Sequence, residues 1–155
     1  MEETSQKKQL KEWMGLWRAT DTAYTKFLKQ WNLSLNAYLT LSWLNEHPNG
    51  SEPAQIADGV NIQRQLVAII LRDFETRKWI SRKERREDHR RKCIKLTNEG
   101  RQTAETICDL IDNVESKTLD ALNENELNLF IEASKRFHGA LQTIILKQIE
   151  IADAK

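Results

Sequence analysis

The chain has 155 residues, of which 39% are hydrophobic and 30% are charged, and its formal net charge is only +1. This balance is typical of a folded, helix-rich protein and excludes a disordered chain. No apolar run approaches the roughly 20 residues that a membrane-spanning helix needs, and the acidic first residues lack the features of a signal peptide. We therefore expect a cytoplasmic protein with no membrane partner.

Basic charge is concentrated in the middle of the chain. Residues 51–97 contain 12 Lys and Arg against 7 Asp and Glu, whereas the remainder carries a net charge of −4. A local basic patch on a nearly neutral chain indicates a localised site for a polyanion rather than general coating of its surface.

Three helices are predicted in the first 59 residues. Apolar residues at three- and four-residue steps predict a helix over 5–31. Ser34 is expected to cap a second helix that ends near His47, and Ser51 to cap a short third helix that ends at Gly59.

The fourth helix is predicted over 62–78, with Asn61 as its cap. Two apolar stripes compete for its core face. We take the stripe that ends on an aromatic residue, which consists of Val67, Ile70, Leu71 and Phe74, in preference to the one that ends on a carboxylate, which consists of Ile62, Leu66, Ile69 and Asp73. The exposed face then carries Arg64, Gln65, Ala68 and Arg72, with Leu66 and Ile69 half-exposed beside them.

Two short strands are predicted next, over 79–84 and 92–96, joined by a polar turn over 85–91. Thr97 and Asn123 are expected to cap two further helices. A helix followed by two strands and an arginine-rich turn is the outline of a winged helix. The predicted fold is therefore mainly α with a small β-hairpin wing.

The helices at both ends of the chain carry long apolar stripes around a compact middle region of roughly 60 residues. Such stripes predict a symmetric homodimer built from the chain ends. The alternative is that they pack on one another within a monomer. The expected organisation is an N-terminal dimerisation helix over 5–31, a winged helix-turn-helix DNA-binding domain over 34–97 and C-terminal dimerisation helices over 98–151.

The sequence around the predicted wing resembles a known family. Asp88-x-Arg90, followed after five residues by Leu96-Thr97-x-x-Gly100, is similar to the wing signature of the MarR family of bacterial transcription regulators. Two upstream segments are also similar to that family, namely Phe74-Glu75-x-x-Lys78-Trp79-Ile80-x-Arg82 and Pro48-Asn49-Gly50-Ser51 with Ile56-Ala57.

The resemblance implies a homodimer that binds a pseudo-palindromic operator on double-stranded DNA, with repression as the expected mode and release by a small molecule. This chain departs from the family pattern at Lys78, where glycine is usual, and at Leu66 and Ile69, where polar residues are commoner. A left-handed Lys78 would cost roughly 1 kcal/mol, unless the helix ends differently.

The predicted DNA-binding residues lie on the fourth helix and on the wing. The helix provides Gln63, Arg64, Gln65, Ala68 and Arg72, because the first turns of this element enter the major groove in helix-turn-helix docking. The wing provides Arg85, Arg86, Asp88, Arg90 and Arg91. The resemblance implies that Asp88 holds Arg90 while Arg90 reaches the minor groove, and the other arginines are expected at phosphates or in that groove.

Other sites are less sharply indicated. A small aromatic or phenolic effector would suit the flat apolar walls of Trp13, Trp17, Tyr38 and Trp43, although core packing explains each of them as well. A thiol-responsive regulator using Cys93 is a second reading.

Catalysis, a metal and a cofactor are not expected, because the chain has no phosphate-binding glycine loop, no nucleophile elbow and no metal-ligand spacing of His or Cys. A dimeric winged helix that binds proteins and has no operator is the alternative from another functional class.

Overall fold

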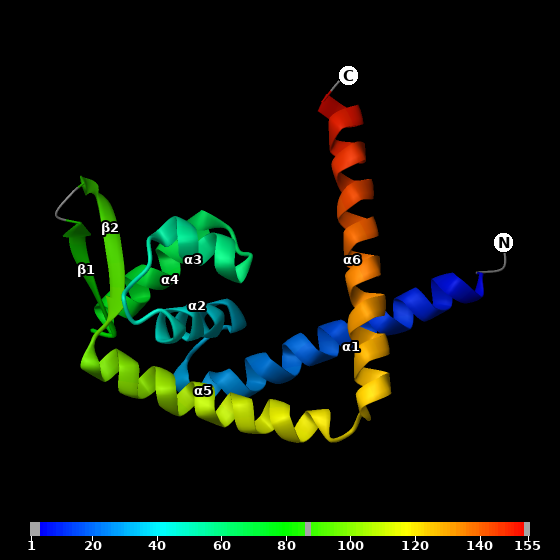
Figure 1. Ribbon diagram of the computed structural model, residues 1–155, viewed down its shortest axis with the longest axis horizontal. Coiled ribbons are helices and arrows are strands. Elements are labelled where there is room, and N and C mark those ends of the chain that lie inside the picture. The colour runs from blue at the N-terminus through cyan, green and yellow to red at the C-terminus, as the bar shows by residue number, and fades with distance from the viewer. Residues whose placement is uncertain (1–3, 86–87, 154–155) are drawn as a thin grey trace. The chain divides into compact units, whose positions relative to one another are not determined.

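The computed structural model describes residues 4–85 and 88–153, and the side chains of residues 83–92 lie outside that description. The chain forms two compact units, Met1–Cys108 and Asp109–Lys155. The elements in chain order are α1 (Ser5–Leu28), the 3₁₀ helix η1 (Lys29–Trp31), α2 (Leu35–Glu46), α3 (Pro53–Val60), α4 (Arg64–Thr76), β1 (Ile80–Arg85), β2 (Asp88–Leu96), α5 (Asn98–Leu119) and α6 (Glu124–Asp153) (Figure 1). The predicted fold class, helices with one small hairpin, is confirmed.

The three caps predicted at Ser34, Thr97 and Asn123 are present. The Ala37 N–H donates to Ser34 Oγ at 3.1 Å, and the Gly100 N–H donates to Thr97 Oγ1 at 3.0 Å. Asn123 shares a reciprocal capping box with Glu126, with bonds of 2.9 and 3.0 Å. These caps satisfy backbone donors that a helix N-terminus leaves without intrahelical partners.

Two other predicted caps are wrong. Glu52, not Ser51, caps α3, because Ser51 pairs with Ile94 in an isolated β-bridge. Asn61 closes the end of α3 with a left-handed φ of 59°, and α4 begins only at Arg64, with Gln63 at the N-cap. Asparagine suits both a helix start and a left-handed helix end, so sequence alone does not separate the two roles.

The hairpin is longer than expected. β1 extends to Arg85 and β2 starts at Asp88, so most of the predicted turn over 85–91 is strand. The antiparallel register pairs Ile80 with Leu96 at the base, with an irregularity between Glu84 and Arg85. Residues 83–92 include no aliphatic residue and no Phe, Tyr or Trp, so the strand has no apolar alternation by which it could be recognised.

The first unit encloses its own core, to which most of its elements contribute. Fully or almost fully buried side chains are Leu28, Leu41, Leu44, Ile56, Val67, Leu71, Phe74, Ile94 and Ile107. Figure 1 shows the hairpin at one side of α2, α3 and α4, with its open end leading into α5. Within the described residues, no helix is both long and apolar enough to cross a membrane.

The second unit contains the end of α5 and all of α6. None of the described α6 residues is buried. Its exposed large apolar side chains are Leu129, Phe130, Ile131, Phe137, Leu141, Ile144, Ile145, Leu146, Ile149 and Ile151. These side chains are spread along most of the length of α6.

Candidate nucleic-acid interface

The helix-turn-helix consists of α3, the connection at residues 61–63, and α4. The Ile62 N–H donates to the Ala57 carbonyl at 3.1 Å, which ends α3 at the left-handed Asn61. The Gln63 carbonyl then accepts the N–H groups of Leu66 and Val67 at 3.0 and 3.1 Å, which starts α4. This tight connection sets where the first turn of α4 emerges from the domain.

Helix α4 is strongly two-sided, and the predicted choice between its stripes is confirmed. Val67, Ile70, Leu71 and Phe74 are buried. Gln63, Arg64, Gln65, Ala68 and Arg72 are all exposed. Leu66 is half-exposed and the Ile69 side chain is 56% exposed, so both lie outside the core, as expected. We call the exposed set Gln63, Arg64, Gln65, Ala68, Ile69 and Arg72 the α4 outer face.

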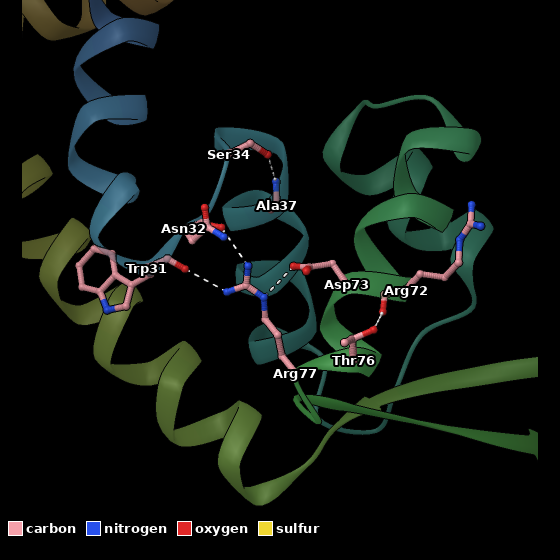
Figure 2. Close-up of polar contacts among 8 residues, drawn as sticks. All are labelled: Trp31, Asn32, Ser34, Ala37, Arg72, Asp73, Thr76 and Arg77. Atoms are coloured by element: carbon pink, nitrogen blue, oxygen red, sulfur yellow. Dashed lines mark hydrogen bonds and ion pairs between the residues drawn. The ribbon is translucent and has the colours of Figure 1, made fainter.

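The arginines of the α4 outer face are only loosely held. Arg64 Nη2 lies 4.0 Å from Asp58 Oδ1, with both side chains 73% exposed. Such an ion pair is worth at most about 1 kcal/mol, so Arg64 can exchange this partner for another. Arg72 Nε donates to the Ala68 carbonyl at 3.3 Å, and Figure 2 shows its guanidinium directed away from the contacts around Arg77. Both cations are available at the surface.

Helix α4 ends with Lys78 in the left-handed conformation that glycine usually adopts. Lys78 adopts a left-handed φ of 61°. The Trp79 N–H donates to the Phe74 carbonyl at 2.9 Å and the Lys78 N–H donates to the Glu75 carbonyl at 3.0 Å. These two bonds form a Schellman motif, and the rings of Phe74 and Trp79 pack 5.5 Å apart as its apolar contact. Lys78 therefore bears the left-handed strain that glycine would avoid.

The base of the hairpin is tied to the end of α4. Arg82 Nε donates to Glu75 Oε2 at 3.1 Å, so Arg82 holds the hairpin against α4. Thr97 Oγ1 donates to the Lys78 carbonyl at 2.7 Å, and a Cβ on Gly100 would overlap the Trp79 carbonyl oxygen. The motif Leu96-Thr97-x-x-Gly100 therefore joins α4, the hairpin and α5 at one point.

Four of the five predicted wing residues have a described backbone position, and none has a described side chain. Arg85 lies at the end of β1, and Asp88, Arg90 and Arg91 lie in β2. Arg86 lies outside the described residues. The predicted interaction between Asp88 and Arg90 involves side chains that the structure does not describe, so it stays a prediction.

The four aromatic residues predicted for an effector differ in their surroundings. Trp17 is exposed, Trp13 is half-buried, and Tyr38 is buried. Trp43 Nε1 donates to Ser51 Oγ at 3.0 Å, its ring stacks on His47 at 4.0 Å, and a Cβ on Gly59 would overlap that ring. Trp43 is thus a packing residue that joins α2 to α3.

Both cysteines are free thiols. Cys93 is half-buried, and its Sγ donates to the Asn49 carbonyl at 3.7 Å, whereas Cys108 is buried. Within the described part of the chain, no three His, Cys, Asp or Glu residues are grouped so that they could hold a metal ion.

Sequence reasoning missed two sets of contacts that organise this region, those of Arg77 and the ion pair between Arg82 and Glu75. The seven-residue spacing of Glu75 and Arg82 spans a helix end, so no helix or strand period indicates it. Arg77 bonds to main-chain atoms about 45 residues earlier, for which a sequence pattern offers no signal.

A left-handed turn between α3 and α4, an amphipathic second helix and an attached two-stranded hairpin define a winged helix-turn-helix protein. Residues 31–91 match the family model described as the MarR family. The resemblance predicted from the wing and helix motifs is thereby confirmed.

Solved structures share the fold over most of the chain. A MepR–DNA complex from S. aureus has 22% identity and a TM-score of 0.75, covering 90% of this chain and 99% of that one. A Streptococcus pneumoniae FabT–DNA complex has 16% identity and a TM-score of 0.73, covering 88% and 98%. The transcriptional regulator SlyA has 23% identity and a TM-score of 0.71, covering 85% and 92%. No curated protein sequence matches the chain.

Proposed function

We propose that the chain is a dimeric, sequence-specific transcriptional regulator of the cytoplasm that represses by occupying a pseudo-palindromic operator on double-stranded DNA. The observation that carries this proposal is the α4 outer face, where exposed Arg64, Gln65 and Arg72 stand opposite a fully buried core face. The fold it shares with MepR and FabT, both solved with DNA, supports the proposal.

The N-terminal part of α4 reads bases in this proposal. Arg64 bonds guanine O6 and N7 together, and Gln63 or Gln65 bonds adenine N6 and N7. Arg72 lies two turns further along and contacts phosphate. Ala68 permits close approach of the helix to the groove, and exposed Ile69 with half-exposed Leu66 meets thymine methyl groups.

The hairpin contributes the second set of contacts. Arg90 enters the minor groove and Asp88 orients it, while Arg85, Arg86 and Arg91 contact phosphates or the same groove. Arginine suits a narrow minor groove because its negative potential is strongest there. The ion pair between Arg82 and Glu75 supports this role, because it holds the base of the hairpin against α4.

Dimerisation is assigned to the helices at the two ends of the chain, residues 5–31 and 98–151, which flank the DNA-binding domain of residues 34–97. The exposed apolar side chains of α6 support this assignment, as do Leu10, Leu16 and Trp17 on α1. A twofold axis also matches the symmetry of a palindromic operator.

The proposal includes a small aromatic effector whose binding releases the operator. Its candidate binding residues are Trp13, Trp17 and Tyr38. Trp43 is the weakest of the four predicted residues, because Ser51, His47 and Gly59 already surround it. The thiol-responsive alternative rests on Cys93 alone, whose Sγ lies beside the Asn49 carbonyl.

Selection of bound sequences from random DNA, with the purified full-length protein, tests the proposal. We expect a palindrome with two half-sites, and an affinity that falls steeply with salt. Arg90→Ala should lower the slope of log affinity against log salt concentration by about 1, because one cationic contact to DNA is lost. Selection of no sequence, together with weak and salt-insensitive binding, would instead identify a protein-interaction module.

A further inference from the structure

Arg77 is the C-cap residue of α4, and its side chain joins that helix to the end of the N-terminal helix. Its Nη1 and Nη2 donate to the carbonyls of Trp31 and Asn32, each at 3.0 Å. Its Nε lies 2.8 Å from Asp73 Oδ2, and its guanidinium carbon lies 4.9 Å from the centre of the Trp79 ring. Figure 2 shows this one side chain reaching from α4 to the end of η1.

The two accepting carbonyls are chemically suited to a guanidinium. They lie at the C-terminus of η1, which continues α1, and carbonyls at a helix end lack intrahelical partners and carry partial negative charge. Asn32 turns the chain there with a left-handed φ of 54°, and its own N–H donates to the Lys29 carbonyl at 2.9 Å. A planar two-pronged donor fits two neighbouring carbonyls, whereas a lysine amine is a single point charge.

The guanidinium is also held in orientation before any ligand arrives. Asp73 lies one helical turn earlier on α4, and Trp79 follows the Schellman motif that ends this helix. The Arg77 side chain is only 22% exposed, so its bonds are screened by water less than those of Arg64. Three of the five Arg77 N–H donors are thus directed at groups within the protein, which favours a role in the position of α4 over a contact with DNA.

We propose that Arg77 is a positioning residue for operator binding, which fixes the angle of α4 against the end of α1 and so sets the separation of the two reading helices in the dimer. This inference rests on the proposed function, because it matters only if α1 dimerises and α4 enters DNA. Two reading helices must match half-sites one helical turn apart, about 34–36 Å. A small rotation at the base of each helix is enough to lose that match.

The test is the dependence of affinity on half-site spacing, measured with the full-length protein on duplexes derived from its selected operator. The duplexes carry the natural spacing, spacings changed by one or two base pairs, or a single half-site. The variants are Arg77→Met, which keeps an apolar stem without the fork, and Arg77→Lys, which keeps the charge without the fork. Lys29→Met is the matched control, because it removes an exposed cation from the same helix end.

We expect the wild type and Lys29→Met to lose about tenfold or more in affinity when the spacing changes by one base pair. Arg77→Met and Arg77→Lys should lose affinity at the natural spacing and discriminate between spacings by less than about threefold, with single half-site affinity within about twofold of wild type. General destabilisation cannot produce that pattern, because it lowers binding to every duplex alike. If Arg77→Met does not give a cooperative thermal transition, Arg77→Lys alone decides.

The inference is overturned if the variants keep the wild-type preference for one spacing, or if the wild type tolerates all spacings equally. A loss of equal size on the operator and on the single half-site also overturns it, since Arg77 would then serve the fold of α4 alone. A wild type that binds no operator overturns the proposed function and this inference together.

Discussion

Helices α4 and α6 are both amphipathic in sequence, but only α4 finds its apolar partners within its own unit. Four α4 side chains are buried among α2, α3 and the hairpin. None of the described α6 residues is buried, although that helix carries ten exposed large apolar side chains. The contrast shows that the winged helix-turn-helix is stabilised by packing within its own unit, whereas the exposed apolar side chains of α6 support the proposed association with a second copy.

This difference makes fold stability and association separable by substitution. A change in the closed core should destabilise the monomer fold, and a change on α6 should weaken the dimer without unfolding the DNA-binding domain.

The largest expected effect is on the core. Phe74→Ala removes a fully buried ring that packs on Trp79, and should lower the free energy of unfolding by about 3–5 kcal/mol in urea denaturation. Ile69→Ala, on the outer face of the same helix, is the control and should change it by less than about 0.5 kcal/mol. Equal losses from the two variants would contradict the assignment of the core face.

The second effect is on association. Ile144→Glu places a charge on the apolar surface of α6, where dimer formation would bury it without a partner in both copies. We expect the dimer dissociation constant to rise by about 100-fold or more in sedimentation equilibrium. Thr143→Glu adds the same charge to the helix face that carries Gly139, Lys147 and Glu150, and is the control. A monomeric wild type would show that α6 is covered by something other than a second copy.

A third, smaller effect concerns the α4 outer face. Arg64→Ala should cost about 1–3 kcal/mol of operator affinity, roughly 5- to 150-fold, because a bidentate contact to guanine is lost. Fluorescence anisotropy with the operator and with an unrelated duplex measures it, and Arg18→Ala on α1 is the control. An equal loss on both duplexes would show that Arg64 contacts phosphate and reads no base.

The smallest effect is at the end of α4. Lys78→Gly should raise the free energy of unfolding by about 0.5–1 kcal/mol, because glycine adopts the left-handed conformation without strain. Thermal unfolding measures this, and Thr76→Gly, two residues earlier at the last position of α4, should destabilise instead. A destabilised Lys78→Gly protein would show that the lysine side chain compensates for its own strain.

Much of the first unit was predictable because its helices carry a strong apolar period and clear caps. The choice of Val67, Ile70, Leu71 and Phe74 as the core face followed from that period and is confirmed. The start of β2 was not predictable, since a strand of polar residues lacks any alternating apolar pattern. Asn61 was assigned to the wrong helix because asparagine satisfies either end.

The site was predictable only in part, for a similar physical reason. Exposed residues of α4 follow from helix geometry once its core face is known, and the structure places them as expected. The contacts of Arg77 to Trp31 and Asn32 join segments far apart in the chain, and they depend on how the helices pack. Long-range positioning of this kind becomes visible only in three dimensions.

The bridge between Ser51 and Ile94 has a consequence for how the wing can vary. Its two backbone bonds, 3.0 and 2.8 Å long, close a loop that contains α3, α4, β1 and most of β2. The bridge closes this loop at the hairpin base. Doubling the length of a flexible loop adds only about 0.6 kcal/mol to the entropic cost of closing it. Insertions or deletions at the hairpin tip should therefore change which DNA sequences are preferred while leaving the fold almost unaffected.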